Sequence, residues 1–346
     1  MTASFRDQVI TDAAAAVRGL TVALGERLGL YRALAGAGPL TAKELATRTG
    51  LDERYTTEWL HAQTSAGYLQ HDPAHDTYQL PDTHATVLAD EDDPAYVAAF
   101  FTALKALYAT EDQLAAAYRS GGGVEWSDHH DSLDTGMGSF FLPGYRANLV
   151  QHWLPALDGV VDRLRAGGKV ADVGCGVGHS TLIMAQAFPQ ATFHGFDYSA
   201  AAIEHARELA RQAGLADRVT FEVAPADGFP GQGYDLVSYF NVLHDLGHPV
   251  PAARWAHQAL AEEGVWMIVE PNAKAALAEN QHAAGRLFMS LSAVMCLPVA
   301  AAQHGPHALG NHAGEAALRA IAEGAGFTRW RRATETAVSA VYQARR

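Results

Sequence analysis

Basic residues are scarce in this chain. Lysine and arginine together number 25 of the 346 residues, against 38 aspartates and glutamates, and the formal net charge is −13. Nucleic-acid binding depends on clustered cationic side chains that neutralise phosphates. This balance therefore argues against nucleic acid as a partner.

Cysteines and long apolar runs are also scarce. The two cysteines, Cys175 and Cys296, lie far apart without metal-ligand spacing, which is typical of free thiols in a reducing compartment. No apolar run reaches the roughly 18 residues of a spanning helix, and the N-terminus lacks a signal-peptide pattern. We expect a soluble cytoplasmic protein with no membrane partner and no metal.

The composition is that of a globular α/β protein, with 49% hydrophobic and 18% charged residues. From residue 169 onward, apolar strand patterns alternate with helical ones, which predicts parallel strands covered on both faces. Two final apolar runs are expected to pair antiparallel at the sheet edge. We expect strands at 169–174, 191–197, 219–224, 234–240, 264–270, 327–333 and 337–343.

A glycine-rich turn follows the first of these strands. Gly174, Gly176 and Gly178 come after Asp172 and lead into a helical pattern. A strand, a glycine turn and a helix start present free backbone N–H groups to a ligand, and glycine lets the backbone approach closely. The dinucleotide pattern G-x-G-x-x-G would need glycine where His179 stands.

Asp197 ends the second strand, about twenty residues beyond this turn. An acid at that place can accept hydrogen bonds from both ribose hydroxyls of a nucleoside. The alternative is that Asp197 only caps the helix beginning near Ser199. Asp172 has a similar alternative, in which it only supports the turn.

The N-terminal region predicts a winged helix. Two helices over 4–36 precede a capping box of Thr41 and Glu44, a helix over 52–66 and a hairpin. The helix over 52–66 carries one arginine against three acids, unlike helices that enter the major groove. A structural or dimerising role is therefore favoured over DNA binding.

We divide the chain into three parts. Residues 1–92 form the winged-helix and dimerisation domain. Residues 93–165 form a helical connector, with one long helix over 94–120, that contributes to the substrate pocket. Residues 166–346 form the catalytic domain, in which the apolar insertion 272–312 follows the fifth strand and acts as a lid over an acceptor.

His244 follows the fourth strand, where ligands of parallel sheets bind. An imidazole there is suited to general-base work near neutral pH. The alternative is a packing or capping histidine, since the chain contains 17 histidines. The histidines at 129–130 and at 304, 307 and 312 are weaker candidates for metal ligands.

These motifs resemble a known family. The run from Asp172 to Gly178, D-x-G-x-G-x-G, is similar to the first motif of class I S-adenosylmethionine-dependent methyltransferases. The segment Leu243-His244-Asp245 resembles the catalytic segment of small-molecule O-methyltransferases, although Leu246 stands where tryptophan is usual. Together with the winged N-terminus and Phe140–Tyr145 (F-F-L-P-G-Y), nearly the whole chain resembles actinobacterial winged-helix methyltransferases of natural products.

The resemblance implies a Rossmann-like, seven-stranded doubly wound sheet that binds S-adenosylmethionine and releases S-adenosylhomocysteine. It implies that His244 deprotonates a hydroxyl of a small aromatic acceptor while Glu270 orients it, with Asp245 as a competing partner. It also implies a homodimer. The expected cofactor contacts are Asp172, Gly174, Gly176, Gly178, Asp197, Tyr198, Ala226, Asp227 and Asn241. The expected acceptor contacts are Trp126, Phe141, Tyr145, Phe240, Met289 and Met295.

Two alternatives remain open. Relatives in this group also methylate nitrogen or indole carbon, in which case His244 orients the acceptor rather than deprotonating it. The other alternative is a transcription regulator that senses S-adenosylmethionine and binds DNA through the winged helix.

Overall fold

A computed structural model describes residues 4–305 and 308–346. The chain forms two compact units, one of residues 1–106 and 131–144, the other of residues 107–130 and 145–346. The residues predicted as a connector are divided between these units. The predicted domain boundaries at 92 and 165 stay predictions.

The N-terminal part of the first unit has the predicted winged-helix order. Its helices begin where the sequence supplies caps: the side chain of Thr41 accepts from the backbone N–H of Glu44, and Asp52 accepts from that of Tyr55. Tyr31, Trp59 and Tyr78 fill its core. The elements are α1 (Phe5–Arg27), α2 (Leu30–Leu34), α3 (Ala42–Thr49), α4 (Glu53–Ser65), the antiparallel strands β1 (Gln70–Asp72) and β2 (Thr77–Gln79), and α5 (Asp82–Leu88).

The second unit is built on a seven-stranded sheet, as predicted. The strand order is β5-β4-β3-β6-β7-β9-β8, with β9 antiparallel to both neighbours and the other pairs parallel. The strands are β3 (Lys169–Val173), β4 (Thr192–Asp197), β5 (Val219–Val223), β6 (Tyr234–Phe240), β7 (Leu260–Pro271), β8 (Arg329–Glu335) and β9 (Ser339–Arg345).

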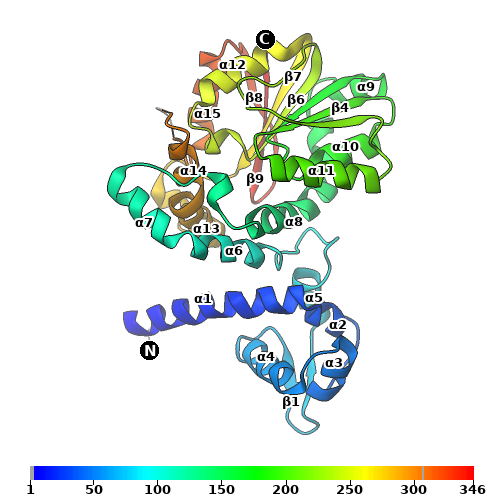
Figure 1. The fold of residues 1–346 in the computed structure, drawn as a ribbon, viewed down its shortest axis with the longest axis vertical. Coiled ribbons are helices and arrows are strands. Elements are labelled where there is room, and N and C mark those ends of the chain that lie inside the picture. The colour runs from blue at the N-terminus through cyan, green and yellow to red at the C-terminus, as the bar shows by residue number, and fades with distance from the viewer. Residues whose placement is uncertain (1–3, 306–307) are drawn as a thin grey trace. The chain divides into compact units, whose positions relative to one another are not determined.

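Helices cover both faces of this sheet (Figure 1). On one face, α12 (Pro249–Ala259) and α15 (Gly314–Gly324) pack through alanines and leucine against Trp266, Ile268 and Tyr342. On the other lie α9 (Val160–Arg165), α10 (His179–Ala187) and α11 (Ala200–Gln212). The small alanine side chains let the helices approach the sheet closely, so the strands that carry the site are rigidly held.

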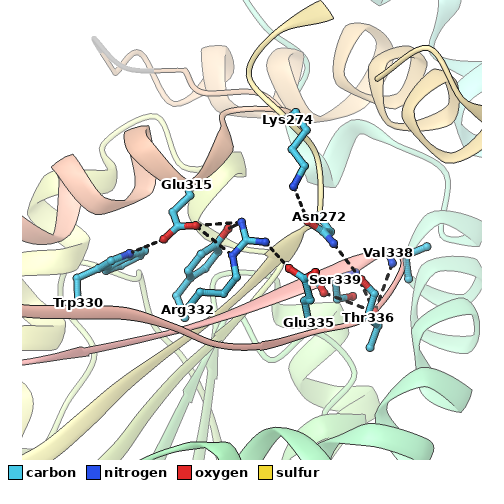
Figure 2. A network of polar contacts seen from close by, with 10 residues as sticks. Asn272, Lys274, Glu315, Trp330, Arg332, Glu335, Thr336, Val338 and Ser339 are labelled. Carbon is cyan, nitrogen blue, oxygen red and sulfur yellow. Dashed lines mark hydrogen bonds and ion pairs between the residues drawn. The ribbon is translucent and has the colours of Figure 1, made fainter. Parts of the chain in front are cut away.

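The antiparallel edge is tied to the end of β7 by a polar network (Figure 2). Arg332 on β8 forms an ion pair with Glu315 of α15 at 3.0 Å, and Asn272 donates to the carbonyl of Thr336 at 3.0 Å. The backbone N–H of Asn272 also bonds the carbonyl of Val338. These contacts fix the carboxyl end of β7, where Glu270 lies.

One expectation about the helices was wrong. The single helix predicted over 94–120 is two helices, α6 (Phe100–Ala109) and α7 (Glu111–Ser120). Thr110 separates them, since its hydroxyl donates to the carbonyl of Leu107 and competes with helix continuation. After a short turn at Trp126–Asp128, α8 (Ser132–Asn148) follows and continues into a π-turn, Leu149–Trp153, and a 3₁₀ turn, Leu154–Ala156.

The insertion after β7 is mainly one continuous helical stretch. After a 3₁₀ turn, Leu277–Asn280, come α13 (Ala283–Leu291), a π-turn, Ser292–Cys296, and α14 (Leu297–Ala302). By length and composition alone, 283–302 is apolar enough to cross a membrane. The part of this stretch around Cys296 packs inside the unit, since Met295, Cys296, Val299 and Ala300 are buried.

Candidate active site

The predicted glycine turn joins β3 to α10, and all three glycines adopt the left-handed conformation. Their φ angles are 68° at Gly174, 52° at Gly176 and 84° at Gly178. A Cβ on Gly174 would lie 2.4 Å from the side chain of Val242, whereas one on Gly176 would meet no atom within 4 Å. The backbone of Gly176 therefore borders open space into which a ligand can come close.

Asp197, at the end of β4, holds this turn. One carboxylate oxygen accepts from the N–H of Gly176 at 2.9 Å, and the other accepts from the N–H of Ser199 at 2.9 Å. The cap of α11 is Ser199, whose hydroxyl accepts from Ala202. Asp197 therefore supports the turn, and its contact with ribose hydroxyls stays a prediction.

Asp172 lies fully buried under the same turn. Its carboxylate accepts from the hydroxyls of Ser180 and Thr181 at 2.6 Å and from that of Ser238 at 3.0 Å. Burial raises the pKa of Asp172 to about 6, while the three hydroxyls oppose that rise. These contacts support the alternative in which Asp172 braces the turn, and its contact with a cofactor stays a prediction.

Three further predicted cofactor residues follow β4 and β5, which are neighbouring parallel strands. Tyr198 is half exposed, and Asp227 is exposed. The carbonyl of Ala226 accepts from the hydroxyl of Tyr239 at 3.3 Å. Their shared edge of the sheet places these residues beside Asp197.

His244 and Glu270 form a buried pair at the ends of β6 and β7. His244 lies in the 3₁₀ turn Leu243–Asp245, and its Nδ1 bonds one oxygen of Glu270. The other Glu270 oxygen accepts from the N–H of Leu243 at 2.9 Å. The exposed fractions are 4% for His244 and 2% for Glu270. The carboxylate thus fixes both the ring and the turn that carries it.

Asp245 lies on the other side of the His244 ring. Its Oδ1 is 3.2 Å from Nε2 of His244 but forms no hydrogen bond of acceptable geometry. Burial lowers the pKa of His244, but the nearby carboxylates of Asp245 and Glu270 outweigh it and hold that pKa well above the usual value. Cys296 also contacts this group, and sequence reasoning missed it because it comes from the distant insertion.

Asn241 shapes the wall next to His244. It has a φ of 56°, a left-handed conformation that asparagine tolerates better than most residues, and its N–H bonds the carbonyl of Val269 at 2.7 Å. Its side chain also bonds Tyr145, and burial raises the pKa of Tyr145 above its usual range. The Tyr145 ring packs on Phe240 at 5.3 Å and on Trp153 at 6.1 Å, and Trp153 had not been predicted.

The other predicted acceptor residues are spread more widely. Met295 is buried on the turn that carries Cys296, and Met289 is partly buried on α13. Trp126 lies 6.4 Å from the ring of His129. Phe141 packs on Phe140 in the first unit.

The weaker metal candidates do not come together. Among the described residues, the one group of three potential ligands is His244, Asp245 and Cys296. The pair at 129–130 and the histidines at 304 and 312 form no such group, and His307 lies outside the described residues.

Comparisons with known proteins agree with this fold. Residues 164–322 match the family model described as "Methyltransferase domain", and residues 15–90 match that of the Rv2258c-like winged HTH domain. The chain is 35% identical to trans-aconitate 2-methyltransferase of Paracidovorax citrulli over 109 residues. This aligned stretch covers 32% of this chain and 41% of that protein. The chain spans less than half the length of the first curated relatives it matches.

Two solved structures match over their whole length. A provisionally assigned O-methyltransferase of Nostoc punctiforme has a TM-score of 0.73 at 21% identity and 99% coverage of both chains. An O-methyltransferase from neocarzinostatin biosynthesis, solved with S-adenosylhomocysteine and 1,4-dihydroxy-2-naphthoic acid, has a TM-score of 0.65 at 19% identity. That match covers 100% of this chain and 99% of the other.

The fold and the two family matches define the class. The chain carries a class I, S-adenosylmethionine-dependent methyltransferase domain together with a winged-helix domain. The open space beside Gly176 fits the close approach of a nucleoside-bearing cofactor.

Proposed function

We propose that this protein transfers a methyl group from S-adenosylmethionine to a hydroxyl of a small aromatic metabolite. The observation that carries the proposal is the buried His244–Glu270 pair at the carboxyl ends of β6 and β7. Ligands of parallel sheets bind at this edge, and a paired, buried imidazole there is equipped to accept a proton.

The bond to Glu270 determines which ring nitrogen of His244 can accept the proton. Because its carboxylate accepts a proton-bearing Nδ1, the lone pair of the neutral ring resides on Nε2. His244 then takes the acceptor's hydroxyl proton through Nε2, and Glu270 stabilises the imidazolium that forms. The protein's other contribution is alignment, since methyl transfer needs the acceptor oxygen, the methyl carbon and the sulfur in line.

His244 must be neutral to act as a base, so its raised pKa works against this mechanism. A base must first lose its own proton, and the carboxylates of Asp245 and Glu270 oppose that loss. S-adenosylmethionine supplies the methyl group and carries a positive charge. A positive charge near the ring lowers the pKa of His244 and favours its neutral form.

The predicted residues divide into a cofactor set and an acceptor set. Gly174, Gly176 and Gly178 let the backbone approach the cofactor, Asp197 accepts the ribose hydroxyls, and Ala226 and Asp227 face the adenine. Tyr145 and Phe240 present aromatic faces beside His244, and Met295 adds an adaptable apolar surface. We include Trp126 and Met289 in the acceptor wall, with the insertion 272–312 as its lid.

We further propose a cytoplasmic homodimer. The helix α1 exposes a row of large apolar side chains to solvent. Monomeric proteins rarely expose a continuous apolar surface of this kind. The free thiols of Cys175 and Cys296 suit a reducing compartment. The substitution Leu20→Glu should convert a dimer to a monomer in light scattering; an unchanged mass would exclude this face. The exposed residues are Phe5, Val9, Ile10, Val17, Leu20, Leu24 and Leu28.

The test is an acceptor screen that measures S-adenosylhomocysteine release. Phenols and hydroxynaphthoates should be methylated, with the product's oxygen identified by NMR. Exclusive methylation of amines or indole carbon would replace O-methylation as the reaction. Salt-sensitive, site-specific DNA binding without turnover would instead support a transcription regulator. The acidic residues of α4 argue against that outcome.

A further inference from the structure

The His244 ring lies next to two potential metal ligands besides Glu270. One is the carboxylate of Asp245, in the same 3₁₀ turn. The other is the thiol of Cys296, from the insertion after β7. The ligand atoms of the three residues all lie within 4.8 Å of one another.

We propose that His244, Asp245 and Cys296 form a binding site for Zn²⁺ or a similar thiophilic cation, and that its occupancy stops methyl transfer. The inhibitory effect rests on the proposed function, because the cation would take the Nε2 lone pair that accepts the acceptor's proton. Cation binding itself does not depend on that function.

The donor set matches zinc chemistry. Zinc prefers imidazole nitrogen and thiolate sulfur and also accepts carboxylate oxygen, commonly with three protein ligands and one open position. Tetrahedral ligands at zinc distances lie ~3.3–3.7 Å apart. The separation between His244 Nε2 and Asp245 Oδ1 is 3.2 Å. Atoms within 4.8 Å of one another need shifts of about 1 Å to surround the cation.

Two surrounding features favour coordination. Glu270 on Nδ1 is the outer carboxylate that typically orients a metal-binding histidine, and Nε2 lies 3.2 Å from Oδ1 of Asp245. The Oδ1 of Asp245 is buried without a hydrogen bond, so a cation would satisfy it. The side chain of Asp245 is 17% exposed, compared with 5% for His244, so the cation enters from the Asp245 side.

The first experiment measures binding to the full-length protein. Calorimetry with ZnCl₂ should give one site, and Co²⁺ should give a thiolate-to-metal charge-transfer band. Cys296→Ser should remove that band and weaken Zn²⁺ binding at least ~10-fold, as loss of a direct ligand exceeds typical outer-partner effects. The matched control is Cys175→Ser, the chain's other cysteine, which should keep both signals.

The second experiment measures methyl transfer with each variant compared to its own metal-free rate. Zn²⁺ should inhibit the unchanged protein and Cys175→Ser, and the Cys296→Ser protein should resist. Mg²⁺ should not inhibit, since it requires oxygen ligands. If Cys296→Ser fails to fold, Asp245→Asn in the binding assay takes its place and should also weaken Zn²⁺.

Zn²⁺ binding that Cys296→Ser leaves unchanged, or a Co²⁺ complex without a thiolate band, would overturn the site. Saturation with Zn²⁺ at full methyl transfer would overturn the inhibition. If no acceptor is methylated, the proposed function fails and the binding assay still decides the metal site.

Discussion

Nδ1 of His244 bonds the carboxylate of Glu270, although 26 residues separate them in the sequence. The bond joins the turn after β6 to the end of β7, and the adjoining N–H of Leu243 bonds the same carboxylate. One buried acid thus fixes the position and tautomer of the proposed base, while Asp245 and Glu270 together favour its charged form. The catalytic predictions follow from this relationship.

Replacing the imidazole should strongly reduce turnover without loss of cofactor binding. We expect His244→Gln to lower kcat about 10²- to 10⁴-fold, the usual contribution of a general base. The affinity for S-adenosylhomocysteine in calorimetry should not change, because the glycine turn and Asp197 are untouched. His248→Gln, at an exposed position on the same segment, is the control; equal kcat in both variants would make His244 structural.

Glu270→Gln should lower kcat while leaving KM nearly unchanged. A glutamine has one acceptor oxygen, so it cannot accept from both Leu243 and His244. We expect a loss on the order of 10- to 100-fold, smaller than loss of the base itself. Glu262→Gln, exposed on the same strand, is the control. A purely structural role would lower the stability of Glu270→Gln without this kcat effect.

The alternating strands and helices, the glycine turn and the antiparallel edge were predicted because period and spacing are local signals. The pair of His244 and Glu270 came from resemblance; the two side chains form a hydrogen bond, and their catalytic roles stay a prediction. The roles of Cys296 and Trp153 were missed because local sequence patterns do not predict which distant residues a buried side chain will contact. The break at Thr110 was missed because a threonine hydroxyl can bond a carbonyl of the preceding turn inside a continuous helix as well, so the residue type alone predicts no break.

Asp197→Asn should weaken S-adenosylhomocysteine binding at least tenfold, or about 1.4 kcal/mol. Its carboxylate accepts from Gly176 and Ser199, and an amide must turn a donor toward one of them. The turn would loosen and the ribose would lose a charged acceptor. Asp217→Asn, exposed between α11 and β5, should bind as before; a similar loss there would point to a general charge effect.

Gly174→Ala and Gly176→Ala should separate folding from binding. Both positions have positive φ, which costs alanine about 1–2 kcal/mol. Only at Gly174 does the new methyl meet Val242, so this variant should lose about 1–3 kcal/mol more in urea unfolding. Gly176→Ala should fold but bind S-adenosylhomocysteine at least tenfold more weakly. Normal binding by Gly176→Ala would show that the cofactor does not use the space beside it.

Asp172 and His179 should act on stability in opposite directions over one range of pH. Burial raises the pKa of Asp172 from 3.8 to about 6, so between these values the folded state holds more protons than the unfolded state. Stability from this group therefore falls as pH rises from 4 to 6. Burial lowers the pKa of His179 from 6.5 to about 4, so the unfolded state holds more protons there and stability rises.

The two contributions, each on the order of 2–3 kcal/mol, nearly cancel in the unchanged protein. Asp172→Asn removes the falling one, and the hydroxyls of Ser180, Thr181 and Ser238 can rotate to suit an amide. Its free energy of urea unfolding, measured without cofactor, should rise more steeply from pH 4 to 6 than that of the unchanged protein. His179→Gln should show the reverse, a fall over the same range. Parallel profiles for all three proteins would mean that Asp172 is ionised throughout, held by its hydroxyls against the cost of burial.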